Sequence, residues 1–363
     1  MEGKLYGVIM AGGGGTRFWP LSRRCKPKQL LNLSGREILI NEAIDRLTRV
    51  VDKNDMFVVT SESHAACLIK ATKGRLKNAN VFVEPSSRNT AACIGYAALK
   101  LVKKYGDGVM AITPSDAAIR DVDTFAEVLK KAAETAESTD KLVTVGITPT
   151  FPATGYGYIH YRKNSRSAVK KVESFVEKPD LKLAKKYVSH GSYAWNSGMF
   201  VWKASVILKK IEQLLPDIYG KLRDIADAFD TDEEERVLRE VYPTIRSISI
   251  DYGVLERCPE DILCIPAEFG WSDVGSWDML NVLHEEDGDG NIALGNVVAV
   301  NTKNSVMYSA SGKLIAAVDV EGMVIVETKD AILICPKDRA HDVKKIVDEL
   351  HEKGMEELLW KPI

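Results

Sequence analysis

The stretch LYGVIMAGGGGTRFWP, Leu5 to Pro20, begins with an apolar run of strand length that stops at a row of glycines. Cations follow the glycines with no acidic residue among them, namely Arg17, Arg23, Arg24, Lys26 and Lys28. Glycine lets the backbone approach a ligand closely and turn at positive φ, so that several N–H groups can converge on one anion. The strand, the glycine loop and the cations together predict a binding site for a polyphosphate. The alternative is a glycine-rich surface turn, and the neighbouring cations argue against it.

Two familiar phosphate-binding motifs do not fit this loop. The P-loop, G-x-x-x-x-G-K-[ST], needs a lysine directly after its last glycine, whereas Thr16 follows Gly15 here. The dinucleotide fingerprint, G-x-G-x-x-G, needs a glycine where Phe18 stands. The loop therefore belongs to neither class.

The composition is that of a globular protein, with 45% hydrophobic and 28% charged residues. A formal net charge of −2 argues against general adhesion to nucleic acid or to a membrane, so the cations near the glycines are a local feature. The 363 residues are enough for two domains, or for one large domain with an appendage.

Cysteine usage and the start of the chain indicate the cytoplasm. The 6 cysteines are scattered and form no C-x-x-C pair, so neither a zinc cluster nor a redox pair is expected. Scattered cysteines in a chain of this size are typical of reduced, mostly buried thiols. The first residues show no signal pattern, and no apolar run approaches the ~18 residues that a membrane helix needs.

Strands and helices alternate over residues 5–147. After the first strand, short apolar runs predict strands at 56–60, 81–84, 109–113 and 142–147. Apolar residues at helical spacing lie between them, at 38–51, 65–71, 89–105 and 124–136. Such continuous apolar strands indicate a parallel sheet with both faces covered. Ligands bind these sheets beyond the carboxyl ends of the strands, so polar residues there are the functional candidates.

Two polar segments close predicted strands. Residues 84–90, Glu-Pro-Ser-Ser-Arg-Asn-Thr, follow the third strand, and Asn89 or Thr90 could cap the next helix. Pro114-Ser115-Asp116 follows the fourth strand. The carboxylate of Asp116 suits either Mg²⁺ binding or another helix N-cap.

The pattern changes after residue 150. Shorter, antiparallel-looking strands are predicted at 154–159, 169–176 and 195–202, a helical region at 203–256, and a further helix beginning at 270–277. The acidic, glycine-rich segment 285–291 divides the chain into the predicted domains 1–284 and 285–363. Short β-rich runs then recur at roughly ten-residue spacing, which predicts a small β coil or barrel. A helix over 339–353 is expected to close the chain.

As a set, these motifs resemble the signatures of the sugar-nucleotide pyrophosphorylases. The run from Gly12 to Arg23, with Pro27-Lys28-Gln29, resembles in particular the mannose-1-phosphate guanylyltransferases, also called GDP-mannose pyrophosphorylases. Further segments agree in order, namely 84–90, 114–116, 149–159, 175–180, 195–202, 249–252 and 270–277. The resemblance implies a Rossmann-like α/β nucleotidyltransferase domain with a mixed, mainly parallel sheet, followed by a small β-rich, β-helix-like domain.

The activity implied by the resemblance is transfer of GMP from GTP to alpha-D-mannose 1-phosphate, with Mg²⁺ as cofactor and GDP-mannose and pyrophosphate as products. A sugar phosphate is already ionised near neutrality, with a second pKa of ~6, so its oxygen needs no general base. The matching segments accordingly contain no histidine. What the reaction needs is in-line positioning and neutralisation of phosphate charge.

The family pattern also implies roles for single residues. Arg17, Lys28 and Lys178 would be catalytic, and Asp116 and Asp273 would bind Mg²⁺. The nucleotide would contact Ala11, Gly12, Gly13, Gly14, Gly15, Thr16, Glu84, Arg88, Asn89 and Ser115. The sugar phosphate would contact Gly155, Tyr156, Glu177, Lys178 and Asn196. The Glu84 carboxylate can accept the N1–H and N2–H₂ pair of guanine, which adenine does not offer.

Two other functions stay open. The chain could be a pyrophosphorylase for another nucleotide or another hexose 1-phosphate, because residue spacing does not distinguish hydroxyl epimers. It could also be a non-catalytic homologue that senses sugar nucleotides. Such a homologue would be expected to lose some of Arg17, Lys28, Asp116, Lys178 and Asp273, and all of them are present.

The chain departs from the family pattern at one residue, since a histidine is expected where Ala117 follows Asp116. No step demands an imidazole, so activity should survive, although the support of Asp116 by its neighbours would differ. The isomerase module of fused relatives is not found after the β-rich region, so a single activity is expected. The β-rich region is a candidate surface for a homodimer.

Overall fold

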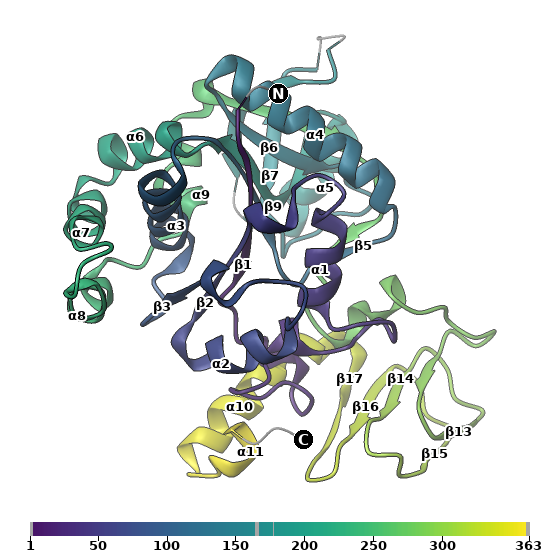
Figure 1. Cartoon of the computed structure of the whole chain (residues 1–363). Coiled ribbons are helices and arrows are strands. Elements are labelled where there is room, and N and C mark those ends of the chain that lie inside the picture. The colour runs from purple at the N-terminus through teal and green to yellow at the C-terminus, as the bar shows by residue number, and fades with distance from the viewer. Residues whose placement is uncertain (1–2, 164–166, 177, 361–363) are drawn as a thin grey trace.

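The computed structural model describes residues 3–163, 167–176 and 178–360 (Figure 1). A 9-stranded sheet forms its centre, in the order β3-β2-β1-β4-β9-β6-β10-β8-β7. The strands are β1 (Leu5–Ala11), β2 (Met56–Ser61), β3 (Val81–Glu84), β4 (Val109–Pro114), β6 (Leu142–Ile147), β7 (Tyr158–Tyr161), β8 (Lys170–Val176), β9 (Tyr193–Lys203) and β10 (Ile262–Ala267).

The sheet is mixed, as predicted. Parallel pairing joins β3, β2, β1 and β4, and it also joins β6 to β10. Antiparallel pairing involves β7, β8 and β9, and β9 lies between β4 and β6. Because β9 runs opposite to both of its neighbours, β4 and β6 still point the same way.

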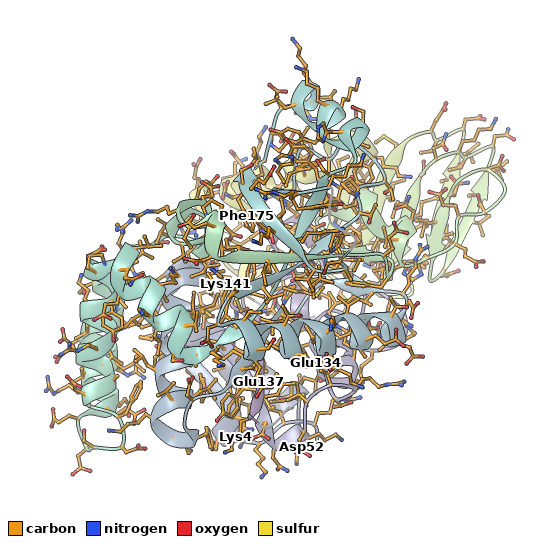
Figure 2. The ribbon with its side chains drawn as sticks, turned by 90° about the horizontal axis from the view of Figure 1, so that it is seen from above. Lys4, Asp52, Glu134, Glu137, Lys141 and Phe175 are labelled. Carbon is orange, nitrogen blue, oxygen red and sulfur yellow. The ribbon has the colours of Figure 1, made fainter. Side chains whose placement is uncertain are left out.

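The register brings the carboxyl ends of the parallel strands to one edge. Ala11 pairs with Thr60, Ser61 with Glu84, and Met10 with Pro114. Figure 2 looks onto the opposite edge, where Lys4 and Lys141 precede their strands. The segments predicted to carry function therefore gather at one end of the sheet.

Helices cover both faces of the sheet, because apolar side chains alternate between them. Val8 belongs to a core with α3 (Asn89–Tyr105), α6 (Ala204–Leu214) and α7 (Pro216–Asp227), whereas Ile9 belongs to a second core with α1 (Leu39–Leu47) and α4 (Val122–Thr139) (Figure 1). The other helices of this part are α2 (Glu62–Ala71), α5 (Leu181–His190), α8 (Glu234–Val241) and α9 (Ile250–Gly253).

The C-terminal part is a short β-helix, as predicted. Its parallel ladders are β12 (Ile292–Leu294) with β14 (Val306–Ser309) and β16 (Met323–Glu327), and β13 (Val297–Val300) with β15 (Ile315–Val318). The strand β17 (Ile332–Pro336) closes the first ladder in antiparallel pairing. Sequence periodicity missed β12.

A third core joins the two parts. Phe18, Trp19 and Trp277 pack there with Val306 and Val324 of the β-helix. The boundary between residues 284 and 285 stays a prediction. No helix in the described part of the chain is long and apolar enough to cross a membrane.

Two predicted helix features are wrong, and one predicted helix differs only in its bounds. Residues 270–277 do not begin a helix: β11 (Trp271–Ser272) pairs with β5 (Ala118–Ile119), and a 3₁₀ helix covers Trp277–Val282. The helix predicted at 339–353 is confirmed as α10 (Val343–Glu352), and residues 339–342 belong to the 3₁₀ helix Lys337–Asp342 that precedes it. A further short helix, α11 (Glu357–Trp360), follows. At α3 neither Asn89 nor Thr90 caps the helix, because Arg88 is the N-cap and makes no side-chain capping bond.

Candidate active site

The glycine loop leaves β1 at Ala11, whose carbonyl accepts hydrogen bonds from Gln29 Nε2 at 2.9 Å and Thr60 Oγ1 at 3.0 Å. Gly15 has φ +61°, and a Cβ added there would lie 2.3 Å from the Cβ of Lys28. Only glycine fits this contact without displacing a neighbour. Gly13 and Gly14 are exposed with open space around them, and Thr16 and Arg17 are exposed as well.

Three of the predicted site residues meet at the ammonium group of Lys28. Its Nζ lies 2.8 Å from Asp116 Oδ2, and it also donates to the backbone carbonyl of Asp273. The Lys28 side chain is only 8% exposed. Asp116 is not a helix N-cap, since α4 is capped by Asp121, so the capping alternative is wrong.

The second carboxylate, Asp273, accepts a hydrogen bond from the Tyr156 hydroxyl at 2.9 Å. Burial raises the pKa of Asp273, and the charge of Asp116 raises it further, whereas Lys28, Tyr156 and Arg17 act against this. The negative charge that Asp116 places beside Asp273 would be neutralised by a bound cation. In the described residues no group of three His, Cys, Asp or Glu side chains forms a metal site. A pair of carboxylates that shares its ion with phosphate oxygens still suits Mg²⁺.

Glu84 lies beneath the start of the glycine loop. It is 5% exposed, its Oε1 accepts a hydrogen bond from the Tyr242 hydroxyl, and a Cβ added at Gly12 would lie 3.7 Å from its Oε2. Burial raises the pKa of Glu84 to about 7, although the hydrogen bonds from Tyr242 and Cys93 lower it. This carboxyl group is therefore poised between its two protonation states.

The other residues predicted to contact the nucleotide differ in exposure. Asn89 is exposed at φ 64°, and its Oδ1 accepts a hydrogen bond from the adjacent Thr90 N–H. The Nε of Arg88 is buried without a hydrogen-bond partner among the described residues, so a ligand could supply one. Ser115 is 3% exposed, and its N–H donates to the Met10 carbonyl at 3.0 Å.

The residues predicted for the sugar phosphate lie around the start of β9. Asn196 donates from Nδ2 to Asp251 Oδ1 at 2.7 Å, and its N–H donates to the Gly157 carbonyl at 2.8 Å. Gly155 is exposed with open space around it. Lys178 follows β8 at φ 41°, a backbone conformation that is strained for lysine. Glu177 lies outside the described residues.

Sequence reasoning missed an aromatic wall beside Asp273. Tyr156 lies between Trp195 and Trp271, with ring centroids 5.2 Å and 5.3 Å away, and Phe151 lies 4.8 Å from Trp195. The indole N–H groups of Trp195 and Trp271 are buried without partners in the part of the chain that the structure describes. Trp195 and Trp271 lie in the segments 195–202 and 270–277, which resemble the family motifs. The sequence therefore pointed to these segments, but not to the two tryptophans as site residues.

Sequence reasoning also missed Arg46 on α1. This side chain is 6% exposed and donates to the Pro114 carbonyl at 3.5 Å. Burial lowers the pKa of Arg46 to about 10, and the charges of Glu42 and Asp116 oppose that shift. Arg46 thus adds positive potential on the protein side of Asp116.

Two of the cations that follow the glycines pair with carboxylates far along the chain. The Arg23 side chain has no exposed surface and pairs with Asp330 at 2.7 Å. Arg24 pairs with Glu356 at 2.8 Å. Both side chains are committed to carboxylates of the C-terminal region.

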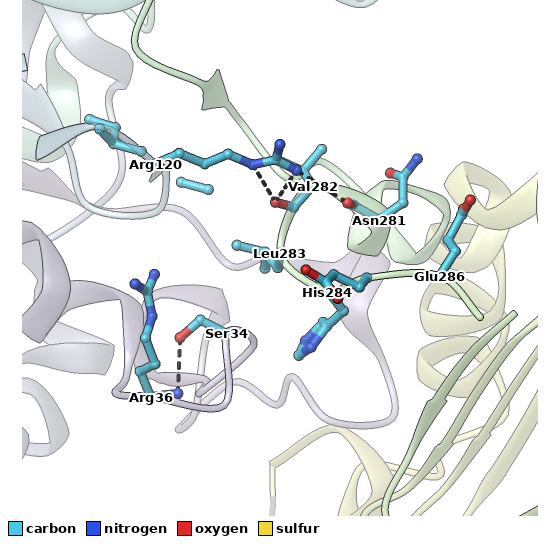
Figure 3. A pocket seen from close by; sticks show the side chains of 11 residues that line it. Ser34, Arg36, Arg120, Asn281, Val282, Leu283, His284 and Glu286 are labelled. Atoms are coloured by element: carbon cyan, nitrogen blue, oxygen red, sulfur yellow. Dashed lines mark hydrogen bonds between the residues drawn. The ribbon is translucent and has the colours of Figure 1, made fainter. Parts of the chain in front are cut away.

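A separate cavity of about 830 Å³ lies behind β5 and the 3₁₀ helix that follows Asp273 (Figure 3). Arg120 spans one wall and donates to the Val282 carbonyl at 2.9 Å, while Ser34 and Arg36 form the opposite wall. None of its lining residues is a predicted site residue. The cavity and the candidate active site are therefore distinct.

Comparison with known proteins assigns the two parts to known families. The family model "Nucleotidyl transferase" matches residues 6–289, and "MannoseP isomerase/GMP-like beta-helix domain" matches residues 295–350. A mannose-1-phosphate guanylyltransferase of Escherichia coli K12 is 39% identical, over 98% of this chain and 75% of its own. The xanthan biosynthesis protein XanB of Xanthomonas campestris pv. campestris (strain B100) is 38% identical, over 97% of this chain and 74% of its own.

A solved structure agrees over the same length. A Thermus thermophilus protein, described as a mannose-1-phosphate geranyltransferase, superimposes with a TM-score of 0.86 and 30% identity, over 96% of this chain and 99% of its own. The β-helix match and the guanylyltransferase relatives both extend well past the catalytic motifs. The chain belongs to the nucleotidyl transferase family, among the mannose-1-phosphate guanylyltransferases.

Proposed function

We propose that the chain transfers GMP from GTP to alpha-D-mannose 1-phosphate and releases GDP-mannose and pyrophosphate. The observation that carries the proposal is the contact of Lys28 with both carboxylate-bearing segments, directly beside the open glycine loop. Relatives that are 36–39% identical and named for this activity support it. All five residues whose loss would mark a non-catalytic homologue are retained, which disfavours that alternative.

The mechanism requires positioning and charge more than proton transfer. The sugar phosphate oxygen attacks the α-phosphorus of GTP in line with the departing pyrophosphate. Arg17, Lys28 and the N–H groups of the glycine loop would stabilise the charge on the triphosphate, and Lys178 would orient the attacking phosphate. No group has to accept a proton from the nucleophile, because it is already ionised.

Asp116 and Asp273 would hold the divalent cation, for which we propose Mg²⁺. When bound, it would neutralise charge on the phosphate oxygens. The Tyr156 hydroxyl fixes one oxygen of Asp273, and Arg46 acts on Asp116 from the protein side. EDTA is expected to abolish turnover and added Mg²⁺ to restore it, whereas a metal-independent rate would refute this role for both carboxylates.

Specificity for the base and specificity for the sugar would come from opposite ends of the site. Glu84, Arg88 and Asn89 would face the base, with Ala11 and Ser115 forming the floor of the loop. Gly155, Tyr156, Glu177 and Asn196 would surround the sugar ring. Phe151, which is 44% exposed and packs against Trp195, offers apolar surface on which a hexose ring can pack.

The test is pyrophosphate release measured with GTP, ATP, UTP and CTP, each combined with the 1-phosphates of mannose, glucose and galactose. We expect GTP with mannose 1-phosphate to give the highest kcat/KM. Equal turnover with ATP or UTP would refute the guanylyl assignment, and equal turnover with glucose 1-phosphate would refute the mannosyl one.

We further propose that the chain acts in the cytoplasm as a homodimer formed through the β-helix, without nucleic-acid or membrane partners. Val318, Ile332 and Ile334 of the β-helix are each 63% exposed, and Ile332 and Ile334, two residues apart on β17, face the same side of that strand. Light scattering in solution tests the dimer. A monomer at micromolar concentration would rule it out.

A further inference from the structure

The loop that connects the glycines to Lys28 is held by a distant segment of the chain. Trp19 Nε1 donates to the Leu358 carbonyl at 3.1 Å, and the Arg24 N–H donates to the Leu359 carbonyl at 2.8 Å. The Arg23 guanidinium donates to the same Leu358 carbonyl. These carbonyls belong to α11, a single helical turn, and the last C=O groups of a helix need partners from outside it. The loop supplies donors to these carbonyls.

Arg23 is committed to this contact by its burial. A buried guanidinium is costly unless it is paired and hydrogen-bonded. Here Asp330 supplies the opposite charge at 2.7 Å, Leu358 supplies a carbonyl, and the Trp19 ring lies 5.5 Å from the guanidinium carbon. Arg23 therefore cannot reach a phosphate without abandoning all three partners.

The same contacts reach both ends of the nucleotide loop. A small cavity of about 90 Å³ is lined by Gly14 and Thr16 on one side and by Val347 and Leu359 on the other. Further along the loop, Arg23 exchanges backbone hydrogen bonds with Lys26 at 3.0 Å and 2.9 Å, two residues before Lys28. A shift of this segment would therefore act on Gly15 and Thr16, whose carbonyls accept hydrogen bonds from Phe18 and Trp19, and on Lys26, which precedes Lys28 by two residues.

We propose that Asp330 and residues 356–360, here named the C-terminal clamp, hold the nucleotide loop in its binding-competent position, with Arg23 as the positioning residue. If the clamp is loosened, the competent loop is populated only part of the time, and the apparent affinity for the nucleotide falls by that fraction. The proposal rests on the proposed function only in taking GTP as the ligand of the loop.

The first experiment compares Asp330→Asn and Trp19→Phe with the wild-type chain. Asp330→Asn removes the charge that pairs with Arg23, and Trp19→Phe removes one N–H donor while keeping an aromatic ring in the core. Asp217→Asn is the matched control, because it removes the carboxylate partner of Arg246 in an exposed pair at 3.0 Å. We expect KM for GTP to rise about tenfold in the two clamp variants. KM for mannose 1-phosphate should stay within about twofold, and the control should match the wild type.

Hydrogen exchange supplies a readout that does not depend on turnover. In both clamp variants the amides of residues 12–26 should exchange faster, while those of β4 and α3 should not change. Unchanged exchange in residues 12–26, or a rise in KM that is equal for both substrates, would overturn the clamp. If the wild-type chain prefers another nucleotide, the proposed function fails, and the exchange data alone decide on the clamp. If Asp330→Asn does not fold, the same KM and exchange measurements on Trp19→Phe decide on the clamp.

Discussion

At the scale of single residues, Lys28 carries the strongest prediction. Its ammonium group pairs with the Asp116 carboxylate and donates to the Asp273 backbone carbonyl, so its removal leaves Asp116 without its cation and takes a positive charge from the triphosphate site. Lys28→Ala should lower kcat by about 10²–10³-fold, the usual cost of removing a preorganised charge partner. The assay is pyrophosphate release under saturating GTP.

The matched control for Lys28 is Lys203→Ala. Lys203 also pairs with an aspartate, Asp140, at 2.6 Å, but it lies at the end of β9 that is remote from the glycine loop. Turnover should be unchanged in this control. A near-normal kcat in Lys28→Ala would show that the geometry at this residue is structural only.

Glu84 predicts a pH dependence of stability. Its pKa is raised from 4.5 to about 7 in the folded chain, so the folded state binds this proton more tightly than the unfolded state does. The stabilisation is therefore fully present below pH 4.5 and is lost as the pH rises through 7. For a pKa raised from 4.5 to about 7, the free energy of unfolding falls by at most about 3 kcal/mol over this pH range. Urea unfolding between about pH 4.5 and 8 should show this slope, and Glu84→Gln should flatten it.

The same proton bears on nucleotide recognition. A carboxylate that accepts the two guanine N–H groups must be ionised, so GTP binding near about pH 6.5 should release a proton from Glu84. GTP affinity should then rise with pH and level off above about pH 8. Calorimetric titration in buffers of different ionisation enthalpy measures the proton directly. Binding without proton release would place the guanine elsewhere.

At the scale of elements, the glycine loop depends on one close approach. Gly15→Ala would add a Cβ 2.3 Å from Lys28 Cβ at a residue with φ +61°. Gly35→Ala is the control, because Gly35 has φ +78° and open space around its Cβ position. Both variants should lose about 1 kcal/mol of stability from backbone strain, and Gly15→Ala should lose more because its Cβ would clash with Lys28. Only Gly15→Ala should also lower kcat, by at least about tenfold, since Lys28 has to move. Equal kinetics in the two variants would contradict this.

The elements also show what sequence could and could not predict. The strand ends at Ala11, Glu84 and Pro114 were predictable, because apolar runs stop where the chain leaves the core. The burial of Arg23 could not be predicted, because it depends on pairing with Asp330, which lies far along the chain. The short strand at Trp271–Ser272 was missed for a similar reason: two residues carry no periodicity, and only pairing with β5 defines them.

The whole molecule is organised by the third core, which belongs to neither predicted domain alone. Trp277 packs against Phe18 at 5.2 Å on the catalytic side and against Tyr308 of the β-helix at 6.1 Å, and its Nε1 donates to the Trp19 carbonyl at 3.2 Å. The β-helix is thus packed onto the residues that follow the nucleotide loop. Stability of the C-terminal part and order of the active site should be coupled.

That coupling predicts a single unfolding transition in scanning calorimetry, with equal calorimetric and van't Hoff enthalpies. Trp277→Ala should cost about 3–5 kcal/mol and split the transition in two, because it opens the core that joins the parts. Trp202→Ala, which empties a fully buried site in the first core instead, should cost as much and keep one transition. Two transitions in the wild-type chain would mean that residues 1–284 and 285–363 unfold independently, and that the third core is a contact between separate domains.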